Sequence, residues 1–160
     1  MARRIDYFDD PTAPAVNSMV PSVNVVVSDD SGRILLIRRT DNGNWAVPGG
    51  AIDLGESMID AAVRETCEES GIDCEITGLI GIFTDPRHVI HYTSNDEVRQ
   101  EFSIVLVGRA VGGEPTASSE SSEVCWVEVA RLPKLQMDRS MRLRLVQYER
   151  YLASGHQHLG

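Results

Sequence analysis

The chain has 160 residues, of which 42% are hydrophobic and 24% charged, and its formal net charge at pH 7 is −9. This length and composition are typical of one globular domain with a single core, and no apolar run is long enough to cross a membrane. The acidic charge argues against nucleic acid as the main partner, because binding to a phosphate backbone needs a basic surface. With three cysteines, no CxxC pair and no apolar signal segment, we expect a cytoplasmic protein without a zinc or disulfide framework.

The first 17 residues are polar and contain Pro11 and Pro14. We interpret residues 1–17 as an N-terminal arm that is either mobile or docked on a partner subunit. A homodimer with two-fold symmetry would bury the three apolar side chains of the arm, which are Ile5, Tyr7 and Phe8. We hold this dimer and a frayed terminus as alternatives.

Three strands are predicted before the first helix. Residues 20–27 are rich in β-branched side chains and lead through a Ser-Asp-Asp-Ser-Gly turn into residues 33–39, so these two strands should form a hairpin. A short strand over residues 45–47 then leads into Gly49 and Gly50.

A helix is predicted directly after the glycines. Ser57 is a suitable N-cap with Asp60 three residues later, and Gly71 suits a left-handed C-cap. At helical spacing, one side of this helix should face the core through Ile59, Ala62, Val63 and Thr66. Three carboxylates gather on another side, from Glu65, Glu68 and Glu69.

The second half of the chain is mainly strands. We expect strands over residues 74–83, 89–92, 98–111 and 124–129, with the third of these crossing the sheet as one long strand and a surface loop over residues 112–122. A C-terminal helix carries an apolar stripe at spacings of four and three, formed by Met137, Met141, Leu145, Tyr148 and Leu152. Residues 155–160 are predicted to be a disordered tail.

The acidic side of the first helix suggests a metal site. Three neighbouring carboxylates repel one another, and Arg64, which can pair with Glu68, neutralises only one of them. A hard divalent cation such as Mg²⁺ or Mn²⁺ prefers oxygen ligands of this kind, and the small Ala61 beside them would leave room for it. For three glutamates on a helix alone, a solvated acidic surface is the competing interpretation.

The spacing around these glutamates is more informative than the glutamates alone. Residues 50–72 follow the pattern G-x5-E-x7-R-E-U-x-E-E-x-G-U, with Thr66 where a larger aliphatic residue is commoner. This pattern resembles the signature box of the Nudix hydrolases, and residues 45–50 resemble the strand that leads into it. The resemblance covers roughly residues 20–135 and implies an α+β fold, an α/β/α sandwich with a mixed sheet between helices, which we assign to residues 18–154.

The resemblance also implies the roles of the box residues. Glu65, Glu68 and Glu69 would be metal ligands, the Gly49 carbonyl a further one, and Arg64 would orient a glutamate. Glu56 would take a supporting or metal-binding role. The general base would be Glu65 in first place and Glu120, from a distant loop, in second.

Substrate contacts are less defined by the sequence. Arg38 and Arg39 end a strand near the box, and one of them could bind phosphate, although two neighbours on a strand face opposite ways. Arg87 lies in a loop that could reach substrate. Phe102 could stack a base, with packing in the core as the alternative.

The reaction that the resemblance implies is hydrolysis of a pyrophosphate bond in a nucleoside diphosphate linked to another group. A small nucleotide would be the substrate, first of all a nucleoside triphosphate in a MutT-like reaction, with ADP-ribose or a nucleotide sugar as the alternative. Two other classes are kept: a Nudix domain that senses a nucleotide without cleaving it, and a plain acidic interaction domain that divalent ions would not stabilise.

Overall fold

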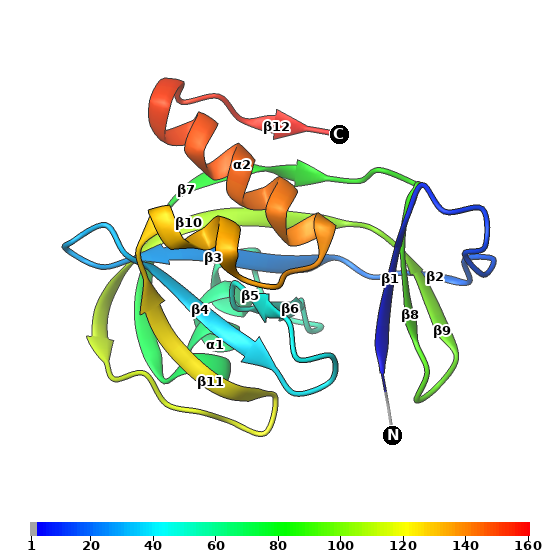
Figure 1. Ribbon diagram of the computed structural model, residues 1–160, viewed down its shortest axis with the longest axis horizontal. Coiled ribbons are helices and arrows are strands. Elements are labelled where there is room, and N and C mark those ends of the chain that lie inside the picture. Colours follow the sequence, from blue (N-terminus) through cyan, green and yellow to red (C-terminus); the bar gives the residue numbers. More distant parts are fainter. Residues whose placement is uncertain (1–2) are drawn as a thin grey trace.

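The computed structural model describes residues 3–160, which form two β-sheets and two α-helices. The larger, eight-stranded sheet has the order β11-β4-β3-β10-β7-β12, with the short β5 and β6 pairing with β4 and β3 (Figure 1). It is mixed, because β10 runs parallel to β3 and β12 parallel to β7, while the other pairs are antiparallel. Its strands are β3 (Ser22–Ser28), β4 (Ile34–Arg39), β5 (Trp45–Ala46), β6 (Gly49–Ala51), β7 (Ile72–Phe83), β10 (Ser103–Gly113), β11 (Ser121–Val127) and β12 (His158–Leu159).

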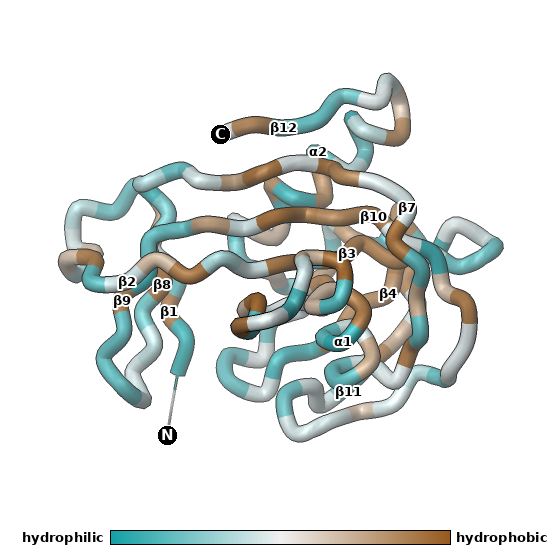
Figure 2. The backbone as a smooth tube through the Cα atoms, turned by 180° about the vertical axis from the view of Figure 1, so that it is seen from behind, coloured by the Kyte–Doolittle hydropathy of each residue, from teal (hydrophilic) through white to brown (hydrophobic). Residues whose placement is uncertain are grey.

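Two helices cover this sheet on its opposite faces, so the predicted α/β/α arrangement is confirmed. Helix α1 (Met58–Ser70) packs on one face, and α2 (Arg139–Ser154), which follows the 3-10 helix η1 (Val129–Lys134), packs on the other. Each face has its own cluster of buried side chains. The tube in Figure 2 shows the central strands β3, β10 and β7 as largely hydrophobic, with hydrophilic turns at their ends.

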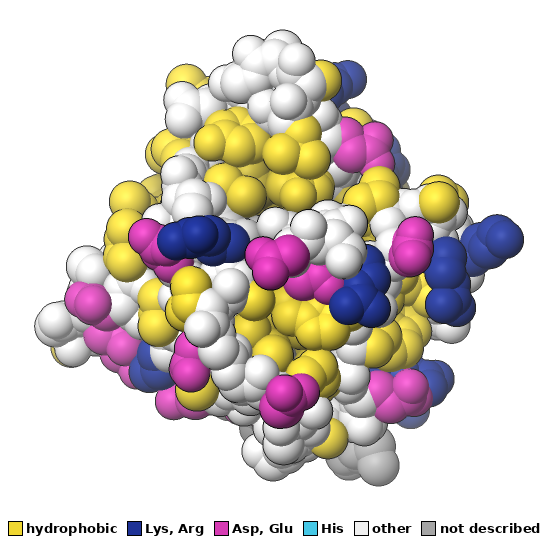
Figure 3. Space-filling model, turned by 90° about the vertical axis from the view of Figure 1, so that its left-hand side faces the viewer, with side chains coloured by type: hydrophobic (Ala, Val, Ile, Leu, Met, Phe, Trp, Pro, Cys, Tyr) yellow, Lys and Arg dark blue, Asp and Glu magenta, His cyan; other side chains and the backbone are white. Residues whose placement is uncertain are grey.

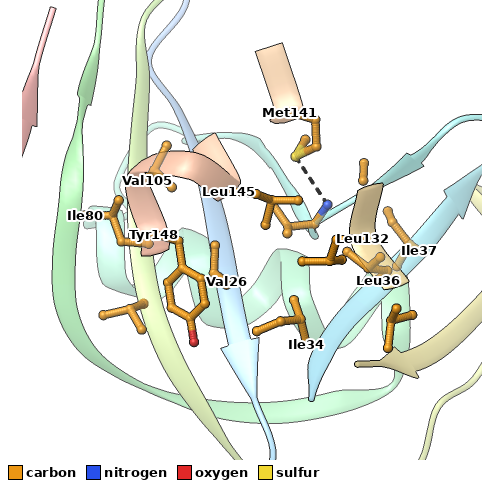
Figure 4. Close-up of a cluster of buried hydrophobic side chains, with 14 residues drawn as sticks. Val26, Ile34, Leu36, Ile37, Ile80, Val105, Leu132, Met141, Leu145 and Tyr148 are labelled. Carbon is orange, nitrogen blue, oxygen red and sulfur yellow. Dashed lines mark hydrogen bonds between the residues drawn. The ribbon is translucent and has the colours of Figure 1, made fainter. Parts of the chain in front are cut away.

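The core under α2 uses the predicted apolar stripe. Met141, Leu145 and Tyr148 are buried against β3, β4, β7 and β10 (Figure 4). Leu152, the last member of the stripe, is 61% exposed. The Met141 sulfur also accepts a hydrogen bond from the backbone N–H of Val47 at 3.5 Å.

The ends of α1 form as predicted. Ser57 and Asp60 make a reciprocal capping box, and Gly71 closes the helix with a positive φ of 74°. The predicted core side is partly wrong: Ile59 is 44% exposed, whereas Ala61 is fully buried. Helix α1 lies against β3, β6 and β7 of the sheet, and the small Ala61 packs into the core beneath it, so this residue does not make room for an ion.

The smaller sheet contains the N-terminal arm, in the order β1-β8-β9-β2. Strand β1 (Arg4–Phe8) pairs antiparallel with β8 (His88–Tyr92), which pairs with β9 (Glu97–Gln100), and β2 (Ser18–Met19) pairs with β9. From residue 3 onward the arm is therefore ordered on its own chain, and residues 1 and 2 lie outside the described range. Because the dimer argument assumed an arm with nothing of its own to pack against, that argument no longer holds, and the homodimer stays an untested prediction.

Two further predictions are corrected. The long strand over residues 98–111 is divided into β9 and β10, because residues 101 and 102 cross from the small sheet to the large one and the Glu101 side chain is buried at the crossing. The tail is not disordered, because β12 pairs with β7 at Gly81 and Ile82.

Charged and apolar side chains are interspersed on the surface. On the face in Figure 3, acidic and basic groups lie close to one another with apolar groups between them. No helix in residues 3–160 is long and apolar enough to cross a membrane.

Candidate active site

The site begins where two glycines let α1 approach β6. A Cβ atom on Gly49 would lie 2.1 Å from the Val23 carbonyl oxygen, and one on Gly50 would lie 2.4 Å from Glu65 Oε1. Neither distance is compatible with a side chain in the observed arrangement. The glycines are therefore required so that the Glu65 carboxylate can lie directly over the strand.

Arg64 gathers the carboxylates of the box. Its Nε contacts Glu56 Oε1 at 2.5 Å, and its Nη1 contacts Glu65 Oε1 at 2.8 Å and Glu68 Oε2 at 3.2 Å. Its Nη2 also donates to the Ala51 carbonyl at 3.2 Å. The hydrogen bonds from Arg64 hold the pKa of the half-buried Glu56 at about 2, so this carboxylate is ionised at neutral pH.

Glu69 occupies the most enclosed position. Its side chain is only 4% exposed, and its Oε2 accepts a hydrogen bond from the Gly49 N–H at 2.9 Å. Burial raises its pKa to about 7, and the charges of Glu65 and Glu120 act in the same direction, against the opposing effects of Gly49 and Arg39. Burial, with added repulsion from Glu68 and Glu120, also raises the pKa of Glu65. The loop carboxylate of Glu120 is therefore within electrostatic reach of the box.

These residues fit a hard divalent cation by their chemistry. Within the described part of the chain, no three acidic, histidine or cysteine side chains already form a metal cluster, and Arg64 contacts three of the predicted ligands. However, the donors are all oxygen, and Glu65 and Glu69 have raised pKa values because burial and their carboxylate neighbours disfavour their ionised forms. A cation among them would relieve that repulsion, and Mg²⁺ or Mn²⁺ matches this ligand type.

A cavity of about 80 Å³ adjoins the box glycines. Gly49 and Gly50 line one side of it, and aromatic side chains from Tyr92 and Phe102 line another. Four arginines from four separate elements also line it: Arg4, Arg39, Arg99 and Arg144. Each of these arginines is held in an ion pair by a carboxylate, and the carboxylate that pairs with Arg144 also lines the cavity. The acidic box therefore lies next to a group of fixed guanidiniums, which are suited to phosphate oxygens.

Of the four predicted substrate contacts, two line this cavity and two do not. Arg39 and Phe102 line it, and Arg39 is held by two contacts to Asp41 at 2.6 and 2.9 Å. Arg38 does not line it: on the opposite side of β4, it contacts Glu123 at 2.7 Å and is 46% exposed. Arg87 lies on a different cavity, where it pairs with Asp85 at 2.7 Å.

Sequence reasoning missed Arg4, Tyr92 and Arg144, and gave Arg99 no role. Arg99 lies 4.7 Å from the centroid of the Tyr92 ring, and Arg144 is buried and contacts Glu101 Oε1 at 2.7 Å. Only Arg144 could have been found from the sequence, because it is a charged residue on the apolar side of α2, between Met141 and Leu145. The other residues come from the arm and the small sheet, whose positions no local pattern gives.

Comparisons with known proteins identify relatives of this chain. Residues 19–147 match the family model described as the NUDIX domain. The chain is 35% identical over 116 residues to a MutT-like protein of Streptomyces ambofaciens, which covers 72% of this chain and 67% of that protein. It is 33% identical over 119 residues to a putative 8-oxo-dGTP diphosphatase of Bacillus subtilis (74% and 72%), and 32% identical over 120 residues to an ADP-ribose pyrophosphatase of Methanocaldococcus jannaschii (73% and 66%).

Solved structures show the same fold. The MutT protein from Methanosarcina mazei Go1 superposes with a TM-score of 0.66 at 23% identity, covering 90% of this chain and 100% of that one. An ADP-ribose pyrophosphatase from Streptococcus suis superposes with a TM-score of 0.67 at 22% identity, covering 89% and 98%.

Proposed function

This chain belongs to the NUDIX domain family of pyrophosphohydrolases, and from that premise we propose that it hydrolyses a nucleoside triphosphate to the monophosphate and pyrophosphate. The observation that carries the proposal is the contact between the acidic box and the arginine-lined cavity at Gly49 and Gly50. Two relatives, a putative 8-oxo-dGTP diphosphatase and an ADP-ribose pyrophosphatase, support hydrolysis of a pyrophosphate bond as the reaction. They do not agree on one substrate.

The box residues would hold the metal ions. Glu65, Glu68 and Glu69 would be the ligands on α1, with Glu56 and the Gly49 carbonyl as further oxygen donors. The chemistry that Mg²⁺ or Mn²⁺ supplies when bound is neutralisation of phosphate oxygens and a lower pKa of water. Arg64 would orient Glu56, Glu65 and Glu68, all of which it contacts.

Glu65 is our first choice for the general base. It is half-buried over Gly50, and burial raises the pKa of its carboxyl, which makes it a stronger proton acceptor than a solvated carboxylate. Glu120 is the second choice, because its charge acts on both Glu65 and Glu69. Arg39 would bind a phosphate oxygen from its position beside Glu69 and Gly49.

A substrate panel tests the proposal. The full chain would be incubated with Mg²⁺ or Mn²⁺ and with nucleoside triphosphates, 8-oxo-dGTP, ADP-ribose, nucleotide sugars or RNA carrying a 5′-triphosphate, and the products would be separated by chromatography. We expect pyrophosphate release from a nucleoside triphosphate with the highest kcat/KM. Faster cleavage of ADP-ribose or a nucleotide sugar would move the assignment to that alternative, and saturable nucleotide binding without turnover would indicate a sensing domain.

A further inference from the structure

A buried row of charged side chains connects the N-terminal arm to α2. Asp6 on β1 contacts Nε of Arg4 at 2.9 Å and Nε2 of His88 at 3.1 Å. On the other side of the imidazole ring, Glu101 contacts Nδ1 of His88, and it also contacts Nη2 of Arg144 at 2.7 Å. None of these side chains is more than 11% exposed. We call them the buried charge row, which consists of Arg4, Asp6, His88, Glu101 and Arg144.

The two ends of the buried charge row lie at the cavity at the box. Arg4 and Arg144 both line this cavity, although Arg4 belongs to the arm and Arg144 to α2. Each guanidinium is held by one carboxylate, Arg4 by Asp6 and Arg144 by Glu101. His88 contacts both of these carboxylates, so its protonation state affects how both guanidiniums are held.

Both ring nitrogens of His88 face carboxylate oxygens. A neutral imidazole has one N–H donor and one lone-pair acceptor, whereas an imidazolium has two donors. Only the imidazolium can therefore satisfy Asp6 and Glu101 at the same time. In the neutral form, one buried carboxylate would lose its donor and face a lone pair, which costs free energy. This carboxylate would move away or take up a proton, and the arginine paired with it would lose its fixed position at the cavity.

Other charged groups around His88 are more distant and carry both signs. Among residues 3–160, its ion-pair contacts are with Asp6 and Glu101 alone. Burial lowers the pKa of His88, but the hydrogen bonds and charges of these two carboxylates outweigh burial and raise it above the ordinary value of 6.5. His88 also lines a second cavity, whose other titratable groups, besides Glu101 and Arg144, are Asp9, Asp85, Arg87, Arg139, His158 and the chain end at Gly160. Because these charges oppose one another at longer range, the two carboxylates in contact decide the protonation of His88.

We propose that His88, as the imidazolium, is a positioning residue that fixes Arg4 and Arg144 where they bind the phosphate chain of the substrate. The identity of this ligand rests on the proposed function. The affinity for a phosphate chain should therefore fall when His88 loses its proton. Because the buried charge row contains none of the box carboxylates, His88 acts on binding and not on the hydrolytic step.

An NMR titration of the full chain without ligand tests the protonation of His88. The ring carbon signals would be followed with pH in the folded protein and in urea, and His88→Gln would assign the signal. We expect His88 to titrate above pH 6.5 in the folded protein and at a lower pH in urea, with the Nε signals of Arg4 and Arg144 changing at the same midpoint. Loss of the proton below pH 6.5 in the folded protein, or arginine signals that do not respond, would overturn the proposal.

Binding of methylenediphosphonate, a pyrophosphate analogue that cannot be hydrolysed at its bridge, tests the positioning role. Its Kd would be measured by isothermal titration calorimetry with Mg²⁺ between pH 6 and pH 10, for wild type, His88→Gln and His91→Gln. Glutamine at position 88 is neutral at every pH and lacks a donor at each end of the ring it replaces. His91 is the matched control, because it lies on the same strand and contacts Asp96 at 2.9 Å but does not line the cavity at the box.

The ratio of the Kd of each variant to that of wild type is the quantity compared. It cancels the ionisation of the analogue and of Glu69, whose pKa is about 7. At pH 6 we expect His88→Gln to raise Kd by about tenfold or more, and the ratio should fall to about one above the midpoint measured by NMR. His91→Gln should leave Kd within about twofold of wild type at every pH.

Three results would overturn the positioning role. A ratio near one for His88→Gln at every pH would show that His88 does not act on the arginines. A raised ratio that stays constant across the NMR midpoint would show that the proton is not required. Wild type that does not bind the analogue would show that the arginines do not hold a phosphate chain. None of these measurements includes turnover, so their failure is distinct from failure of the substrate panel.

Discussion

Replacing Glu101 by glutamine should make the free energy of unfolding less dependent on pH between pH 6 and pH 3. Glu101 is 2% exposed and contacts Arg144 and Nδ1 of His88. Burial alone would raise its pKa, but the charges and hydrogen bonds of these two partners lower it from the ordinary value of 4.5 to about 2. At about 1.4 kcal/mol per pH unit, this lowering corresponds to a stabilisation of about 3 kcal/mol.

The sign follows from the lowered pKa. The stabilisation is complete above pH 4.5, where Glu101 is ionised in both states, and is lost as the pH falls toward 2. Glu101→Gln should therefore be less stable than wild type by about 3 kcal/mol at pH 6 and by less than half of that at pH 3. In wild type, Asp6 and Glu101 raise the pKa of His88 against the opposing effect of burial, so in the Glu101→Gln variant only Asp6 opposes burial.

Urea unfolding at pH 3, 4, 5 and 6, at constant ionic strength, measures the difference. Glu75→Gln is the control, because it removes a carboxylate from an exposed pair with Arg109 and should change stability by no more than about 0.5 kcal/mol at each pH. If the free energies of unfolding of wild type and Glu101→Gln differ by the same amount from pH 6 to pH 3, the buried ion pair does not lower the pKa of Glu101.

Three further predictions concern the box. Millimolar Mg²⁺ or Mn²⁺ should raise the Tm of wild type but not of a folded Glu68→Gln, Glu69→Gln double variant, and an unchanged wild-type Tm would contradict the metal site. Glu65→Gln should lower kcat by several orders of magnitude with little change in KM, and a larger effect of Glu120→Gln would move the base to the loop. Gly50→Ala should leave the protein folded, because its Cβ displaces only the end of the Glu65 side chain, yet lower kcat by about 100-fold or more. Normal kcat in this variant would show that the position of Glu65 over β6 is unimportant.

Features set by neighbouring residues could be predicted from the sequence. The cap of α1 at Ser57, its end at Gly71 and the buried stripe of α2 depend on contacts within a few residues. The candidate box was likewise found through fixed spacing along one helix and the turn before it. Even there, the core side of α1 was misjudged at Ile59 and Ala61, because the packing of β6 against the helix is a tertiary effect.

Features set by distant partners could not be predicted. The arm is ordered by pairing between β1 and β8, more than 80 residues away, and by the contact of Asp6 with Ser140 at 2.9 Å. Residues 98–111 alternate like one strand, but Glu101 breaks the strand because its partners, His88 and Arg144, come from β8 and α2. The same long separations hid most of the arginines that line the cavity beside the box.

The hydrogen bond from Val47 to the Met141 sulfur makes this methionine a chemical reporter of helix movement. Met141 is 4% exposed, whereas Met19 and Met58 are 52% and 40% exposed. Peroxide should therefore oxidise Met19 and Met58 first and reach Met141 only when α2 lifts from the sheet. The rate of sulfoxide formation at Met141, followed by peptide mass spectrometry, would thus record how often α2 lifts from the sheet beside the cavity at the box in the native protein.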